Sequence, residues 1–194
     1  MFMNLPNKLT ILRVFMAPIA MIFIMFPIGG ETAARCIAAV VFILTSLTDM
    51  LDGKIARKYN LITNFGKFMD PLADKFMVIG MLVTMCASEQ YAVFRPVMVW
   101  VTILVILREL AVTSLRLLVA SSAEKIVVAA SWLGKVKTVS QIVCILVMIL
   151  EPILLPFDSM FIFSWITIAF MGIMTVWSGI DYLKSYLAFI NPNE

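Results

Sequence analysis

Residues 49–74, DMLDGKIARKYNLITNFGKFMDPLAD, carry four aspartates in two pairs. Asp49 and Asp52 are three residues apart, and Asp70 and Asp74 are four apart. Because both spacings bring side chains onto one face of a helix, each pair is predicted to lie on its own helix. Apolar sequence flanks the stretch on both sides, and a carboxylate near a bilayer is costly unless its charge is compensated. A bound multivalent cation is the simplest compensation.

The residue types limit what this stretch can bind. The chain has no histidine, and its three cysteines are dispersed in apolar runs without a zinc spacing. A metal would therefore be held by oxygen, which favours Mg²⁺, Mn²⁺ or Ca²⁺. Gly53 and Ala56 share the helix face of Asp49, Ala56 at about 20° from it. These small residues leave the carboxylate face open to a ligand that approaches closely.

Composition places the stretch in a membrane protein. The chain of 194 residues is 62% hydrophobic and 14% charged, with a mean hydropathy of +1.03. These values are typical of an all-α polytopic membrane protein, with residues 1–194 forming one domain. The opening NLPNKLTILRV predicts a short amphipathic helix on the membrane surface, and Glu151 and Asp158 are expected in outer loops. Six spans of about 20 residues are predicted, at 10–28, 34–56, 68–88, 92–120, 134–155 and 159–187.

The placement of basic residues predicts the orientation. Of the 15 Lys and Arg residues, all except Arg35 and Arg95 fall at the ends that are cytoplasmic if the N-terminus is inside. Cytoplasmic loops of membrane proteins carry such an excess. We therefore expect a multi-pass protein of the plasma membrane, with both termini and the aspartate stretch at the cytoplasmic face.

The full pattern is Asp49, two residues, Asp52-Gly53, two residues, Ala56-Arg57, eight residues, Gly66, three residues, Asp70, three residues, Asp74. It resembles the signature of the CDP-alcohol phosphotransferases, with every fixed position present. The alternative reading, solvated charges at helix ends, suits one pair of aspartates better than the whole pattern. The resemblance implies six transmembrane helices, a homodimer, and transfer of a substituted phosphoryl group from a CDP-linked donor to an alcohol, with release of CMP.

The resemblance also implies roles for the residues of the pattern. The four aspartates would bind Mg²⁺ or Mn²⁺, as two ions, and Asp74 would also be the general base that takes the proton of the attacking hydroxyl. Gly53 and Ala56 would admit the cytidine, and Arg57 would contact the nucleotide phosphates. Gly66 is expected to allow the turn between the two helices, although an ordinary loop glycine would look the same. The positions expected to bind the CDP donor are Asp52, Gly53, Ala56, Arg57 and Gly66.

A second set of basic residues points to the acceptor. Arg108 has apolar sequence on both sides, and Arg116 follows at i+8 on roughly the same helix face. Lys135 and Lys137 lie at the start of the fifth expected span, and Arg13 lies at the start of the first. Anchoring at the membrane surface is the alternative for such cations. Several inward-facing cations near a metal–diphosphate site would instead bind an acceptor that carries its own phosphate.

Further segments narrow the resemblance within the family. NLPNKLTILRV, LREL with the later LR, WLGKVKT and WSGIDYLKSYL look like bacterial members that use CDP-diacylglycerol and glycerol 3-phosphate. The implied products are phosphatidylglycerophosphate and CMP, and the implied partners are the two substrates, membrane lipids and a second copy, without nucleic acid.

Two other functions stay open at this point. One is a different enzyme of the same family, such as a cardiolipin, phosphatidylserine or phosphatidylinositol-phosphate synthase. The other is a small ion-coupled transporter, whose carboxylates should lie near the bilayer midplane. The charge distribution places these aspartates at the cytoplasmic end instead.

Overall fold

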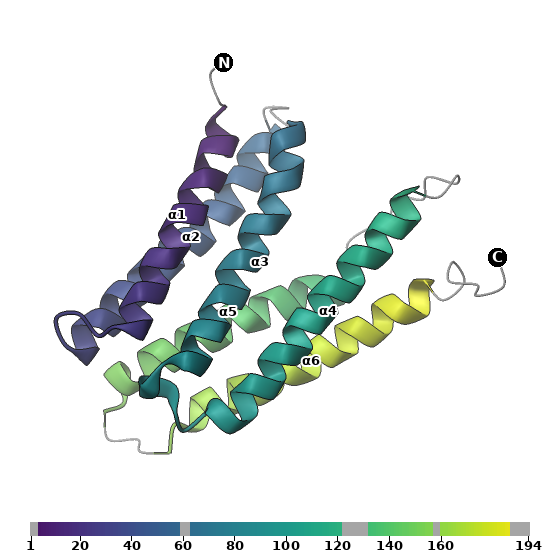
Figure 1. Cartoon of the computed structure of the whole chain (residues 1–194). Helices are drawn as coiled ribbons and strands as arrows, with labels where there is room; N and C mark the ends of the chain where they lie inside the picture. Colours follow the sequence, from purple (N-terminus) through teal and green to yellow (C-terminus); the bar gives the residue numbers. More distant parts are fainter. Residues whose placement is uncertain (1–3, 59–62, 122–131, 157–159, 187–194) are drawn as a thin grey trace.

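The computed structural model describes residues 4–58, 63–121, 132–156 and 160–186, and the side chains of these ranges except those of 50–58, 64, 67, 119–121 and 186. Within them the chain is all-helical, without strands (Figure 1). The α-helices are α1 (Leu5–Met25), α2 (Glu31–Lys58), α3 (Asn64–Ala87), α4 (Arg95–Ser121), α5 (Trp132–Leu154) and α6 (Ile162–Tyr186), with a 3₁₀ turn, η1 (Glu89–Tyr91), between α3 and α4.

Local sequence sets where the first helices begin. The Asn4 side chain accepts a hydrogen bond from the Asn7 backbone N–H at 3.2 Å, and Pro6 stands in the first turn, where its missing N–H is harmless. From there α1 continues without interruption through residues 5–25, so the expected surface segment and the expected first span share one helix. Gly29 and Gly30, at φ +81° and +99°, form the turn into α2.

In the part of the chain that the structure describes, five helices are long and apolar enough to cross a membrane, namely α1, α2, α4, α5 and α6. The remaining long helix, α3, carries its charged residues in its first half and apolar residues from Phe76 onward. Each expected span overlaps one of the six helices, with boundaries that differ by several residues. The chain is therefore an all-helical protein with multi-pass membrane character.

The helices form two neighbouring groups around a continuous core (Figure 1). Helix α1 packs against α2 and α3, α6 packs against α4 and α5, and contacts of α3 with α4 and of α2 with α5 join the groups. Alanines such as Ala17, Ala20 and Ala38 are fully buried, which lets α1 and α2 approach closely. Flexible methionines, including Met81 and Met148, fill the remaining space.

The structure corrects the position of Glu151. The sequence predicted an outer-loop charge, but Glu151 lies in α5 and is 4% exposed. Its carboxylate accepts hydrogen bonds from the backbone N–H groups of Phe163 (2.9 Å) and Ser164 (2.8 Å) and from the Ser164 hydroxyl. Glu151 therefore satisfies backbone donors in the first turn of α6, where a negative charge is favourable. Asp158 lies outside the described residues.

Candidate functional site

The aspartate pairs lie on two consecutive helices, one pair on each, as the spacing predicted. Asp49 and Asp52 are in the last turns of α2, whereas Asp70 and Asp74 are in the first turns of α3. The side chains of Asp49, Asp70 and Asp74 are partly exposed. Helices α2 and α3 both pack against α1, and the short connection between them leaves the two aspartate pairs at the same end of the fold. The remaining donor-site positions of α2, Gly53, Ala56 and Arg57, are in the same turns as Asp52; the side chains of residues 52–57 lie outside the described part.

Arg13 of α1 joins the two aspartate helices. Its Nη1 lies 2.8 Å from Asp49 Oδ1 and also donates a hydrogen bond to Asp74 Oδ1. The Arg13 side chain is fully buried, while the side chains of Asp49 and Asp74 are 40% and 41% exposed. One nitrogen atom therefore contacts a carboxylate of each helix. The position of Arg13 Nη1, in contact with two carboxylates, is therefore favourable for a positive charge.

The start of α1 also holds the start of α3. The Thr10 hydroxyl donates to Asp70 Oδ1 at 2.6 Å. The Thr63 hydroxyl accepts a hydrogen bond from the Gly66 N–H and donates to Asn7 Oδ1, both at 3.0 Å. Each of these contacts crosses from α1 to α3 or caps α3. The orientation of the α3 carboxylates therefore depends on α1.

The expected role of Gly66 in the turn between the helices is wrong, because Gly66 lies inside the first turn of α3. A Cβ atom at Gly66 would stand 3.1 Å from Asn7 Oδ1 and 3.3 Å from the Thr63 hydroxyl oxygen. It would also stand 3.7 Å from Asp70 Oδ2. A side chain at this position would therefore crowd the contact between α1 and the start of α3, beside an aspartate of the pattern.

The donor set fits a hard divalent cation. The side chains available are carboxylates, and those of Asp49 and Asp74 converge from two helices on the position of Arg13 Nη1. Among the side chains that the structure describes, no three metal-ligating groups are close enough to hold an ion together. The fourth aspartate, Asp52, is not among those side chains. All-oxygen ligation by carboxylates is the chemistry of Mg²⁺ and Mn²⁺ sites.

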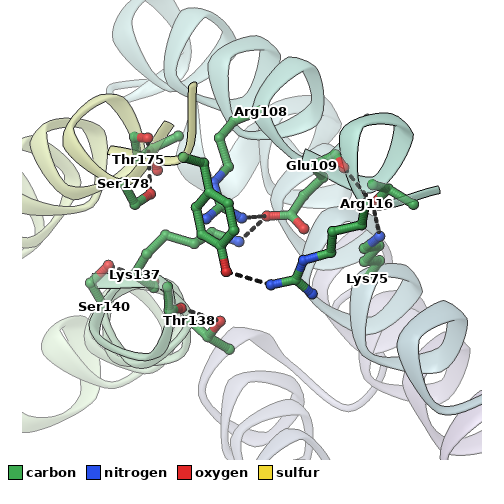
Figure 2. Close-up of polar contacts among 12 residues, drawn as sticks. Lys75, Arg108, Glu109, Arg116, Lys137, Thr138, Ser140, Thr175 and Ser178 are labelled. Atoms are coloured by element: carbon green, nitrogen blue, oxygen red, sulfur yellow. Dashed lines mark hydrogen bonds and ion pairs between the residues drawn. The ribbon is translucent and has the colours of Figure 1, made fainter. Parts of the chain in front are cut away.

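A second polar cluster is centred on Glu109 of α4 (Figure 2). Its Oε1 accepts a hydrogen bond from Arg108 Nη1 at 3.1 Å and another from Lys137 Nζ of α5. The side chains of Arg108, Glu109 and Lys137 are 10%, 12% and 5% exposed. Burial of this kind is tolerated only when the charges are paired. Glu109 is therefore the internal partner of two buried cations.

Arg108 keeps two donors for another partner. Within the described part of the chain, its Nε and Nη2 are buried and have no hydrogen-bond partner. These two N–H groups point to the same side of the planar guanidinium, which is the arrangement that binds a phosphate or carboxylate through two parallel hydrogen bonds. Leaving such donors buried without a partner is costly. The geometry indicates a site for an oxyanion at Arg108.

Lys75 and Arg116 complete the basic cluster, defined here as Lys75, Arg108, Arg116 and Lys137. Lys75 donates to the hydroxyl of Thr113, which in turn donates to the Glu109 backbone carbonyl at 2.6 Å. Arg116 donates through Nη2 to the hydroxyl of Tyr182 on α6. Lys75 directly follows Asp74 in α3. The same turn of that helix therefore carries an aspartate that contacts Arg13 and a lysine of the basic cluster.

The structure divides the residues that the sequence grouped as acceptor-binding. Arg108, Arg116 and Lys137 are members of the basic cluster, whereas Arg13 contacts the aspartates. Lys135 is exposed, while Lys137 is 4% exposed. Residues two positions apart on a helix point in directions about 200° apart, so Lys135 and Lys137 cannot both face the same pocket.

Several contacting residues were not given a role by the sequence. These are Thr10, Thr63, Lys75, Glu109, Thr113 and Tyr182. The sequence could have indicated a role for Glu109, since a carboxylate beside an arginine within an apolar segment needs a partner. The others became evident only through contacts between helices.

Comparison with known proteins places the chain in a family. Residues 3–177 match the family described as CDP-alcohol phosphatidyltransferase, and the chain belongs to it. It is similar to a protein of Bacillus subtilis (strain 168) named CDP-diacylglycerol--glycerol-3-phosphate 3-phosphatidyltransferase, with 41% identity over 93% of this chain and 94% of that protein. A protein of the same name from Haemophilus influenzae is 35% identical over 93% of this chain and 92% of the relative. A probable phosphatidylglycerophosphate synthase of Mycobacterium tuberculosis is 36% identical over 95% and 82%.

Proposed function

We propose that this protein transfers the phosphatidyl group of CDP-diacylglycerol to glycerol 3-phosphate, giving phosphatidylglycerophosphate and CMP. Family membership supports the reaction class, and the names of the relatives support the substrates. The structural observation that carries the proposal is the pair of Arg108 donors within the basic cluster, Nε and Nη2, which have no partner in the part of the chain that the structure describes. Asp74 and Lys75, consecutive residues of α3, link that cluster to the aspartates. A phosphorylated acceptor would place its hydroxyl near the aspartates and its phosphate at the basic cluster.

The reaction is one displacement at phosphorus. A hydroxyl oxygen of glycerol 3-phosphate forms a bond to the phosphorus that carries diacylglycerol, and the bond from that phosphorus to the oxygen of CMP breaks. The proton of the attacking hydroxyl passes to Asp74. Asp74 is suited to this role because its side chain, in the first half of α3, is 41% exposed, and the chain offers no histidine for it.

The four aspartates, Asp49, Asp52, Asp70 and Asp74, would hold two divalent cations, Mg²⁺ or Mn²⁺. When bound, such ions offset the charge of a diphosphate and stabilise the attacking and leaving oxygens. Arg13 would remain between α2 and α3 and share in balancing the carboxylates. Thr10 would keep Asp70 oriented through its hydrogen bond.

The donor is assigned to the last turns of α2 and the first turn of α3. Gly53 and Ala56 would leave room for the cytidine beside Asp52, and Arg57 would contact the nucleotide phosphates. Gly66 lets α1 and α3 lie close together next to Asp70, and would itself present no side chain to the donor.

The acceptor phosphate is assigned to the basic cluster. Arg108 would bind it through Nε and Nη2, with Arg116 and Lys137 adding charge nearby. Lys137 would remain hydrogen-bonded to Glu109, which keeps its ammonium in place. Lys135, being exposed, would contribute only long-range attraction.

Release of CMP from CDP-diacylglycerol tests the function directly. The purified protein with Mg²⁺ should release CMP when glycerol 3-phosphate is added, and release little with serine, phosphatidylglycerol or inositol phosphate. CMP release with one of those acceptors but not with glycerol 3-phosphate would assign the chain to another reaction of its family. No CMP with any acceptor, under conditions where the protein is folded, would favour the transporter.

We further propose that α3 also spans the membrane, in addition to the five more apolar helices, which gives six spans. Both termini would then lie at the cytoplasmic face of the plasma membrane. Helix α3 has 24 residues, about 36 Å at 1.5 Å per residue, which is long enough to span. Its charges lie at the end that the basic residues place inside. The first turns of α1 would then lie at the cytoplasmic membrane surface.

This topology predicts how cysteines react in a variant without native cysteines. A cysteine at Ala92, which is exposed beside η1, should react with an impermeant reagent added to intact cells, whereas one at Lys184 should not. The reverse pattern would overturn the orientation. The homodimer implied by the family resemblance stays a prediction that light scattering of the purified protein would test.

A further inference from the structure

Tyr182 lies where the two arginines of the basic cluster meet α6. It is 3% exposed, and its hydroxyl accepts a hydrogen bond from Arg116 Nη2. The Cζ atom of Arg108 lies 5.3 Å from the centre of the Tyr182 ring, and that of Arg116 lies 5.2 Å from it. A single aromatic ring therefore contacts both guanidinium groups.

A ring and a carboxylate stabilise cations in different ways. The electron-rich face of an aromatic ring attracts a guanidinium without cancelling its formal charge. Glu109 already accepts hydrogen bonds from Arg108 Nη1 and Lys137 Nζ. A second carboxylate in the place of Tyr182 would neutralise the positive charge of the cluster further. With tyrosine there, both arginines are held while their charge stays available to an anion.

The neighbouring turn of α6 fixes Arg108 from another direction. Gly179 precedes Tyr182 by three residues and shares its helix face. A Cβ atom at Gly179 would stand 3.4 Å from Arg108 Cγ, so the aliphatic part of Arg108 lies directly against the glycine. The stem of Arg108 is set by Gly179 and its guanidinium by Tyr182 and Glu109. Its Nε and Nη2 remain for a ligand.

We propose that Tyr182 is a positioning residue for the acceptor: it holds Arg108 and Arg116 in the orientation that binds the phosphate of glycerol 3-phosphate. The inference rests on the proposed function and extends the acceptor site to α6. Tyr182 acts through the two arginines, and the selectivity of the enzyme for a phosphorylated acceptor depends on it.

The test compares two substitutions of Tyr182. Tyr182→Phe keeps the ring but removes the hydroxyl that contacts Arg116, and should raise the KM for glycerol 3-phosphate roughly threefold. Tyr182→Leu also removes the ring and should raise that KM roughly tenfold or more. The KM for CDP-diacylglycerol should stay within about twofold in both, because neither contact concerns the donor site. The preference for glycerol 3-phosphate over unphosphorylated glycerol should fall in the same order.

Trp177→Leu is the matched control, since Trp177 is a large aromatic residue of the same helix with 59% of its surface exposed. It should leave both KM values unchanged. Equal losses for donor and acceptor in Tyr182→Leu, or a normal acceptor KM in both Tyr182 variants, would overturn the positioning role. If Tyr182→Leu does not fold, Tyr182→Phe decides through its acceptor KM and its preference between the two alcohols.

The proposed function and this inference fail in different ways. If the unmodified protein releases no CMP with glycerol 3-phosphate, the proposed function is wrong. If it does, and Arg108→Ala raises the acceptor KM while the Tyr182 variants behave normally, only the positioning role is wrong.

Discussion

Asp74→Asn is expected to lower turnover by at least about 100-fold, the lower range for loss of a general base. An amide has nearly the size of the carboxylate but cannot take a proton at neutral pH. Arg13 would keep its ion pair with Asp49, so the packing of α1 against α2 and α3 should survive. Much of the donor affinity should survive too, because three aspartates remain.

Measurements of CMP release, donor affinity and Mn²⁺ affinity separate the base from a cation ligand. Asp52→Asn should weaken Mn²⁺ and donor binding as well as turnover, since it removes charge without removing the base. Asp181→Asn, the same chemical change on α6, should be close to normal. Normal turnover by Asp74→Asn would refute the assignment of the base. If its loss of activity were restored entirely by higher Mn²⁺ concentrations, Asp74 would be only a ligand.

The helical architecture was predictable because it depends on local properties of the sequence. Long apolar segments between polar turns gave the approximate positions of all six helices. The continuity of α1 was less evident, because NLPNKLTILRV has the mixed polarity of a surface helix. Its polar residues Asn7, Thr10 and Arg13 are instead buried against α2 and α3, where they contact the aspartate helices and the Thr63 cap.

The site was predictable in part for the same reason. The spacing within each aspartate pair correctly predicted a helix for each, since that inference needs only the helical repeat. The partner of Arg13 was not predictable from spacing, because it depends on how three helices pack. The difference between Lys135 and Lys137 was accessible from the sequence: residues two apart face different sides of a helix, and only Lys137 is buried. The sequence could have indicated that Glu109 needs a partner, but which residues it contacts, and any role for Tyr182, became evident only from the packing of α4, α5 and α6.

Arg108→Ala is expected to lower kcat/KM for glycerol 3-phosphate by about 2–3 kcal/mol, or roughly 30- to 150-fold, as for loss of a buried charge-assisted contact. The reason is that Nε and Nη2 form a buried fork with no other partner in the described part of the chain. The loss should appear mainly in the acceptor KM. The KM for CDP-diacylglycerol should change much less, because the donor is assigned to α2 and α3.

Three comparisons make the Arg108 prediction specific. Arg108→Lys should restore activity only partly, because lysine keeps the charge but lacks the planar fork. Arg95→Ala, the same change at the opposite end of α4, should have little effect on either KM. Unphosphorylated glycerol should be a poor acceptor for the unmodified protein and should suffer less from Arg108→Ala than glycerol 3-phosphate does. Equal losses with the two alcohols would mean that Arg108 supports the fold or the donor site, and the acceptor site would then have to be sought elsewhere.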